Sequence, residues 1–203
     1  MSRTYAERIV ERLGAEPALH VVPRADVVAA LNPRFPGLLD SEAVEEALAP
    51  IVSDLRVGEG LVYSDAEQAL QVLQAVRSDL MMLQRRSAGI GMVSDALFSA
   101  LMMLATTHYF DDRTEEASGV MEEVVQRFGT SREVTDDTYH PKVVGLYDDA
   151  VVKRTGAGTS TLTVTTVPTG AELIIDGRVM SDRSPASFPN LLKGRHDVIA
   201  RLD

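Results

Sequence analysis

The middle of the chain carries apolar residues at spacings of three and four, which is the pattern of amphipathic helices. It predicts helices over 65–85, 95–110, 113–128 and 141–153, and an earlier one that begins near residue 41. Asp40 or Ser41 is the predicted cap of that first helix, Pro50 is expected to kink or divide it, and Gly58 and Gly60 to end it. The helix over 95–110 has little polar surface, so we expect it to lie buried between its neighbours.

The N-terminal part of the chain has a different pattern. Residues 3–13 and 24–31 are predicted helices, and the apolar run 18–22 between them is a predicted strand. A single strand leaves its own backbone donors and acceptors unpaired, so it needs a partner strand. We therefore expect a small helix–strand–helix element over 1–37.

Past residue 160 the apolar period changes to two, which indicates strands. Strands are predicted over 161–166, 172–175 and 196–202, with a tight reversal at Asp176–Gly177 and a turn at 191–194. The run TGAGTS, residues 155–160, is interpreted as a flexible linker. The predicted fold is α+β: a mainly helical domain over 1–154, the linker, and a small β-module over 161–203.

The C-terminal stretch resembles a PEGA domain, a family named for a Pro-Glu-Gly-Ala motif that here stands as Pro168-Thr169-Gly170-Ala171. A Ser-Pro pair and a Leu-x-x-Gly-x-His element follow in the family's order. The positions that carry the resemblance, called the landmark residues below, are Pro168, Gly170, Ala171, Asp176, Gly177, Pro185, Gly194 and His196. The resemblance implies a non-catalytic β-module of bacterial or archaeal surface-associated proteins, with binding to other envelope components.

The family normally continues beyond the point where this chain stops. The module is therefore expected to be incomplete. Its 196–202 edge is expected to be open, frayed or paired with a strand of another chain, which would allow homo-oligomers.

A second resemblance lies in the helical part. Leu104-Ala105, followed by Ala117, Met121 and Val124, is similar to the spacing of small and large residues in a tetratricopeptide repeat. This resemblance implies paired helices that bind a protein partner. In some bacteria PEGA domains are joined to such repeats or to protein kinases.

The charge of the chain excludes some partners. The net charge is −10, so phosphate backbones and anionic membrane surfaces are repelled. No Cys is present and no apolar run approaches the ~20 residues that span a bilayer. The charged N-terminus is not a signal peptide. A periplasmic or cell-surface location then requires an export signal outside this sequence, and a cytoplasmic location stays open.

Residues that could carry chemistry are scattered. The four histidines, His20, His108, His140 and His196, show no metal-ligand spacing. The paired acids, such as Asp111-Asp112 and Asp136-Asp137, form no calcium-loop pattern and are interpreted as solvated surface. No nucleophile or phosphate-loop motif occurs. The sequence predicts no enzyme, no cofactor and no metal.

Methionines cluster along the helical part. Two interpretations stay open, core filling and an adaptable partner groove, and the first is the more common use of Met. The candidate partner surface comprises Met81, Met82, Met92, Met102, Met103 and Met121.

The leading hypothesis is a non-catalytic protein-binding scaffold or adaptor of the bacterial cell envelope. The alternative is an extracytoplasmic sensor or regulatory fragment of a larger signalling protein, such as a membrane kinase. A third is an enzyme whose site is built from Asp, Glu and His, which would require a pocket that gathers such groups with perturbed pKa values.

Overall fold

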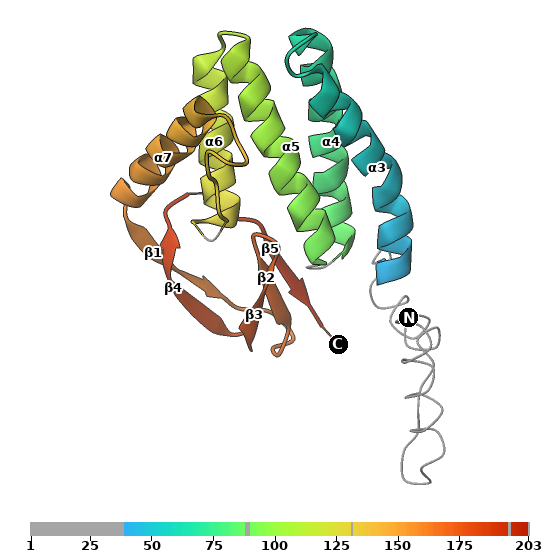
Figure 1. Ribbon diagram of the computed structural model, residues 1–203. Coiled ribbons are helices and arrows are strands. Elements are labelled where there is room, and N and C mark those ends of the chain that lie inside the picture. Colours follow the sequence, from blue (N-terminus) through green and yellow to red (C-terminus); the bar gives the residue numbers. More distant parts are fainter. Residues whose placement is uncertain (1–38, 88–89, 131, 195, 203) are drawn as a thin grey trace. The chain divides into compact units, whose positions relative to one another are not determined.

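The computed structural model describes residues 39–87, 90–130, 132–194 and 196–202 (Figure 1). Residues 39–203 form one compact unit. The fold is α+β, with a helical body followed by a small antiparallel β-module. The helix–strand–helix element predicted over 1–37 lies outside the described residues.

The helical body consists of helices that each pack against the next one along the chain. They are α3 (Ser41–Leu61), α4 (Ala66–Ser87), α5 (Gly91–Phe110), α6 (Thr114–Phe128) and α7 (Pro141–Gly156). α5 also contacts α3 and α7, so it lies at the centre of the body. Its side chains Leu97, Leu101 and Met102 are fully buried, which confirms the prediction of a buried helix.

The first described helix is longer than predicted. Asp40 caps it, since its Oδ1 accepts a hydrogen bond from the Ala43 N–H at 2.8 Å. The helix is not divided at Pro50 and continues through Gly58 and Gly60 to Leu61, so the predicted end at these glycines is wrong. Packing explains Gly58, because a Cβ there would lie 2.8 Å from Cγ and Cδ2 of Leu73 on α4. The glycine lets the two helices approach closely.

The β-module contains two small sheets. The strands are β1 (Thr159–Val164), β2 (Glu172–Ile175), β3 (Arg178–Arg183), β4 (Ala186–Leu192) and β5 (Val198–Arg201). β1 pairs with β4, and the second sheet has the order β3-β2-β5, with all pairs antiparallel. Leu173 and Ile175 of one sheet and Phe188 of the other form a core separate from that of the helices.

The sequence pattern did not predict the strands β3 and β4. β3 has no buried residue and only Met180 is partly covered, so its polarity hides it from a pattern that requires apolar alternation. The turn predicted at 191–194 is also wrong at its start, because Leu191 and Leu192 belong to β4 and pair with Ser160 and Thr159.

The predicted linker over 155–160 is wrong as well. α7 runs through Gly156 and β1 begins at Thr159, which leaves only Ala157 and Gly158 between them. The Thr155 hydroxyl donates to the Val151 carbonyl at 2.7 Å and so satisfies a helix-end acceptor. Arg154 donates to the Gln126 side chain at 2.7 Å and to the Lys193 carbonyl at 3.3 Å. The helix end is therefore fixed on both sides, and small polar residues there do not make a flexible tether.

Candidate functional site

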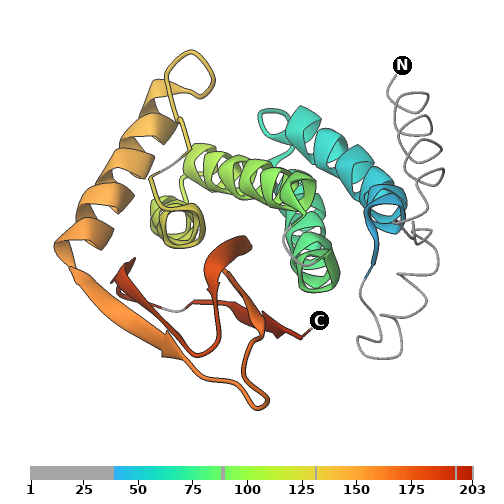
Figure 2. The same cartoon turned by 90° about the horizontal axis from the view of Figure 1, so that it is seen from below.

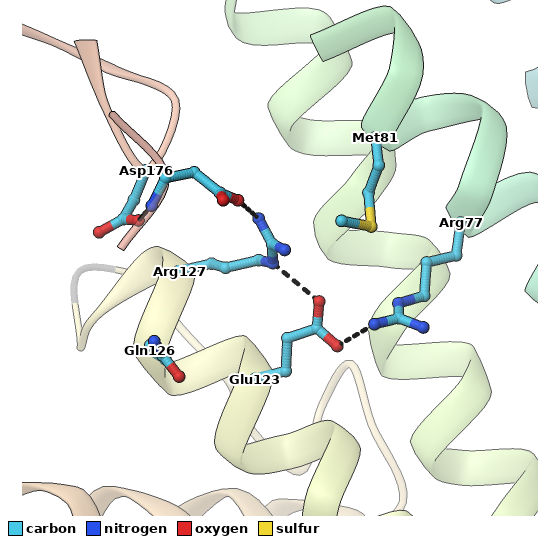
Figure 3. Close-up of a pocket in the computed structure, with 7 residues that line it drawn as sticks. Arg77, Met81, Glu123, Gln126, Arg127 and Asp176 are labelled. Atoms are coloured by element: carbon cyan, nitrogen blue, oxygen red, sulfur yellow. Dashed lines mark hydrogen bonds and ion pairs between the residues drawn. The ribbon is translucent and has the colours of Figure 1, made fainter. Parts of the chain in front are cut away.

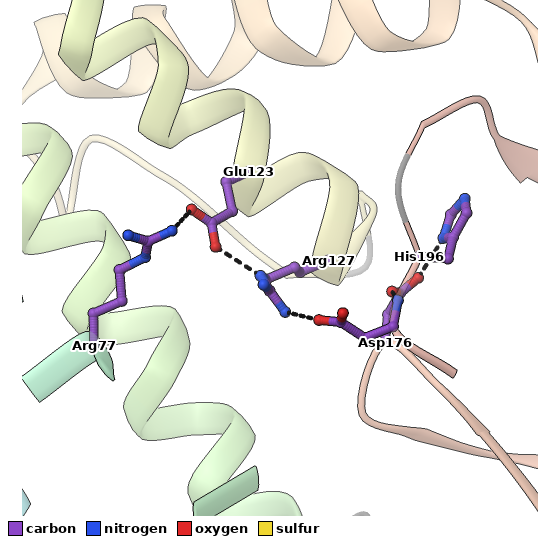
Figure 4. A network of polar contacts seen from close by, with 6 residues as sticks. Arg77, Glu123, Arg127, Asp176 and His196 are labelled. Carbon is purple, nitrogen blue, oxygen red and sulfur yellow. Dashed lines mark hydrogen bonds and ion pairs between the residues drawn. The ribbon is translucent and has the colours of Figure 1, made fainter. Parts of the chain in front are cut away.

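A chain of charged side chains joins α4 and α6 to the β-module (Figure 4). Arg77 of α4 donates to Glu123 of α6 at 2.6 Å, and the other oxygen of Glu123 accepts from Arg127 Nε at 2.8 Å. Arg127 Nη1 reaches Asp197 Oδ2, just before β5, at 2.7 Å. The Asp197 N–H donates to Asp176 Oδ1 at 3.0 Å. Positive and negative groups alternate from Arg77 to Asp197, and a backbone N–H joins Asp197 to Asp176. This path is called the ionic network below.

Arg127 is the centre of the network. Its side chain is only 14% exposed, and it binds carboxylates from two parts of the fold. Burial alone would lower the pKa of Arg127, but the hydrogen bonds and charges of Glu123 and Asp197 outweigh it and raise the pKa. The guanidinium is thus held as a cation between two anions. Its geometry fits a structural clamp between helix and β-module.

His196 ends the network on the side of the β-module. Its Nδ1 lies 2.7 Å from Asp176 Oδ2 and its Nε2 lies 2.7 Å from the Leu192 carbonyl oxygen. Both partners are acceptors, so both ring nitrogens donate only when the imidazole is protonated. Burial alone would lower the pKa of His196, but these hydrogen bonds and the charge of Asp176 outweigh it and raise the pKa. The cation ties the β2–β3 turn to the end of β4.

Three cavities adjoin the network, and two of them are also lined by α4. The first, of about 270 Å³, lies between α4, α6 and the β-module (Figure 3). Its lining residues are Arg77, Met81, Glu123, Gln126, Arg127, Asp176 and Asp197. The second, of about 330 Å³, is lined by Met81, Gln84, Arg85, Gly177, Asp197, Val198 and Ile199. Most charges around the first cavity are paired with one another.

Four landmark residues lie at or beside the network. Asp176 and Gly177 form the β2–β3 turn with positive φ angles of 50° and 80°, as a tight reversal needs. A Cβ at residue 177 would lie 2.4 Å from Gln84 Nε2, so the turn packs closely on α4. His196 binds Asp176, and a Cβ at Gly194 would lie 2.9 Å from Arg154 Nη1. These residues shape the surface that meets the helices.

The other landmark residues form a second group within the β-module. Ala171 is fully buried, and its N–H donates to the Ser184 hydroxyl at 3.0 Å. Ser184 N–H donates back to the Ala171 carbonyl at 2.9 Å, and Gly170 N–H donates to the Ser184 carbonyl at 2.7 Å. Pro168 and Pro185 lie beside this pairing and each follows a cis peptide bond. The landmark residues thus lie in two groups: one contacts the helices, and the other is hydrogen-bonded within the β-module.

The methionines do not form one surface. Met102 and Met121 are fully buried in the helical core. Met82 and Met92 are exposed, and Met81 and Met103 are partly covered. Of the six, only Met81 lines a cavity beside the network. The six side chains therefore differ in exposure, and the prediction that all six line one partner surface is wrong.

The other described histidines have separate surroundings. His108 is buried on α5, its Nδ1 has no hydrogen-bond partner among the described residues, and burial lowers its pKa. His140 caps α7, since its Nδ1 accepts from the Lys142 N–H at 3.2 Å. His20 lies outside the described residues. In the described ranges no three His, Cys, Asp or Glu side chains are grouped as a metal site. None of the described helices is long and apolar enough to cross a bilayer.

Sequence reasoning missed Arg77, Glu123, Arg127 and Asp197. The i, i+4 spacing of Glu123 and Arg127 was a detectable signal, because such pairs meet on a helix face. The partners Arg77 and Asp197 come from elements 46 and 70 residues away, and no local pattern connects them.

Comparison with known proteins adds no relative: no protein-family model matches the chain, and neither a curated protein nor a solved structure does.

Proposed function

We propose that this protein is a non-catalytic, protein-binding scaffold or adaptor. The observation that carries the proposal is the pair of adjoining cavities between α4 and the β-module, beside charged groups that are already paired with one another. An acid–base catalyst needs a titratable group turned toward a substrate. Here the carboxylates of Glu123, Asp176 and Asp197 are each paired with another side chain of the same molecule instead.

The helical body also supports this proposal. Helices that stack in sequence form a rigid frame whose outer faces are free for partners. Large apolar side chains are exposed at several separate places on the described surface, including Val57, Met82, Val152 and Val179. A rigid frame with a docked β-module suits a protein that holds others in place.

The location in the cell envelope belongs to the same proposal and rests on the resemblance of residues 161–203 to a PEGA domain. Protease treatment of source cells with a permeabilised outer layer and an intact cytoplasmic membrane tests it. Digestion of the chain without cell lysis is expected, and full protection until lysis would contradict an exposed location.

Photo-crosslinking in the source cells tests the binding function. A photoreactive residue is placed one at a time at Val57, Met82, Val152 and Val179, which are exposed and make no essential core contact. At least one position is expected to give a discrete adduct with a second protein at native expression level. Absence of any adduct from all four positions would overturn the proposal.

A further inference from the structure

The two cavities that are lined by both α4 and the β-module lie side by side. They share Met81 on the helix side and Asp197 on the strand side, so they adjoin. Arg77, Met81, Gln84 and Arg85 of α4 line one side. The other side is lined by the β2–β3 turn at Asp176 and Gly177 and by the chain from Asp197 to Ile199, and Glu123, Gln126 and Arg127 of α6 close one end. Figure 2 shows β5 next to α4. This hollow is called the α4–β5 groove.

The strand that borders the groove lies at the edge of its sheet. β5 follows β2 in the order β3-β2-β5 and has no second neighbour among the described strands. Ile199 pairs with Ile174, and the Asp176 N–H donates to the Asp197 carbonyl at 2.9 Å. In an antiparallel ladder both backbone groups of a residue point the same way and successive residues alternate. Asp197 and Ile199 therefore face β2, whereas Val198 and Ala200 present their N–H and C=O groups outward.

We propose that the α4–β5 groove binds an extended peptide segment of a partner protein, which pairs with β5 as an added strand. The inference rests on the proposed function and names its surface and partner class. The outward groups of Val198 and Ala200 supply the backbone hydrogen bonds. Side chains of such a segment alternate, so every second one faces the groove beside Met81 and Val198.

Charge specifies the segment further. Arg77 and Arg127 are neutralised by Glu123 and Asp197. Arg85 lines the groove, is exposed, and makes no ion pair with a described residue. This leaves one unmatched positive charge beside the strand edge. The segment that fits combines apolar or β-branched residues with an acidic side chain that reaches Arg85.

A free peptide fits this edge better than a second copy of the chain does. Every copy carries a net charge of −10, which opposes self-association. The β5 strand of a second copy would also arrive with its own β2 and α4 beside it. A peptide that binds by strand addition instead brings only its own extended backbone to the exposed edge of the sheet.

Amide exchange of the full chain tests the pairing directly. The probe is an acetylated peptide of alternating valine and threonine with a glutamate at each end. Its addition is expected to slow exchange of the Val198 and Ala200 amides, while Ile199, already bonded to β2, changes little. The matched control is the same peptide with every backbone nitrogen methylated, which leaves no N–H donor on either edge to pair with a strand.

Variants then separate strand pairing from general attraction. Ala200→Pro removes one outward N–H and is tolerated at an edge. It is expected to weaken binding at least about tenfold, or roughly 1.4 kcal/mol. Arg85→Glu is expected to weaken binding of the acidic probe and to favour a probe with lysines at its ends. Arg56→Glu on α3, an exposed position outside the groove, changes the net charge equally and is the control.

The outcomes decide the proposal. Probe binding that protects other amides, equal binding of the methylated peptide, or no binding overturns it. Protection of Val198 and Ala200 that rises with protein concentration without peptide would assign the edge to a second copy and also overturn it. If Ala200→Pro unfolds the chain, the methylated probe and Arg85→Glu still decide. Photo-crosslinks at other positions would leave the binding function standing when this groove fails.

Discussion

Replacement of Arg127 by methionine tests whether the ionic network holds the β-module to the helical body. The substitution keeps most of the side-chain volume but leaves Glu123 and Asp197 without their shared cation. Exposed ion pairs contribute ~0–1 kcal/mol, and breaking a buried pair costs about 3–5 kcal/mol. The side chains of Arg127, Glu123 and Asp197 are 14%, 20% and 39% exposed, between these limits. We expect Arg127→Met to lower the free energy of unfolding by about 2 kcal/mol.

Urea unfolding followed by circular dichroism measures this change, and a double-mutant cycle isolates the contact. Arg127→Met and Asp197→Asn are expected to show a coupling of about 1 kcal/mol, because the ion pair is lost only once. The control is Lys153→Met, since Lys153 pairs with Glu122 but is 70% exposed and should cost less than about 0.5 kcal/mol. Equal losses in Arg127→Met and Lys153→Met, or no coupling in the cycle, would refute the assignment of the network as a clamp.

Three further predictions concern single positions. The pKa of His196 is raised on folding, so its contribution to stability is complete below the unfolded-state pKa of about 6.5 and is lost as pH rises through the folded-state pKa; unfolding at a series of pH values should show this loss, and His196→Gln should remove the dependence. Gly58→Ala should destabilise by about 1–3 kcal/mol because its Cβ would meet Leu73 at 2.8 Å, whereas Gly60→Ala, in open space on the same helix, should stabilise by about 0.5–1 kcal/mol; thermal melts that rank them the other way would contradict the packing argument. Leu101→Ala should cost about 2–5 kcal/mol in urea unfolding, because Leu101 is fully buried at the centre of the helical body, and a loss below 1 kcal/mol would show that this part of the core is loosely packed.

The helical part of the chain followed from its periodicity. The apolar stripe of α4 includes Ala69, Leu73 and Leu80, and all three are fully buried. The cap at Asp40 and the reversal at Asp176–Gly177 were also local signals, because a side-chain oxygen or a positive φ acts within a few residues. The predicted end of α3 was wrong because glycine was interpreted as a helix breaker. At Gly58 the glycine instead makes room for Leu73 of the neighbouring helix.

The expected strand at 196–202 also rested on local pattern. β5 is shorter than the predicted strand and is paired with β2, but it remains at the edge of the described sheet. The sequence could not indicate that this edge runs beside α4. That juxtaposition depends on how the β-module docks on the helical body.

By itself, the sequence determined an acidic α+β chain with helices followed by a β-module, because period and turn chemistry are properties of neighbouring residues. Only the tertiary structure decided that residues 155–160 hold no flexible linker, that the six methionines divide between core and surface, and that Arg127 joins Glu123 to Asp197. The physical reason is distance along the chain. Asp197 lies 70 residues from Arg127, so their pairing arises only when the packed elements bring both charges to one place.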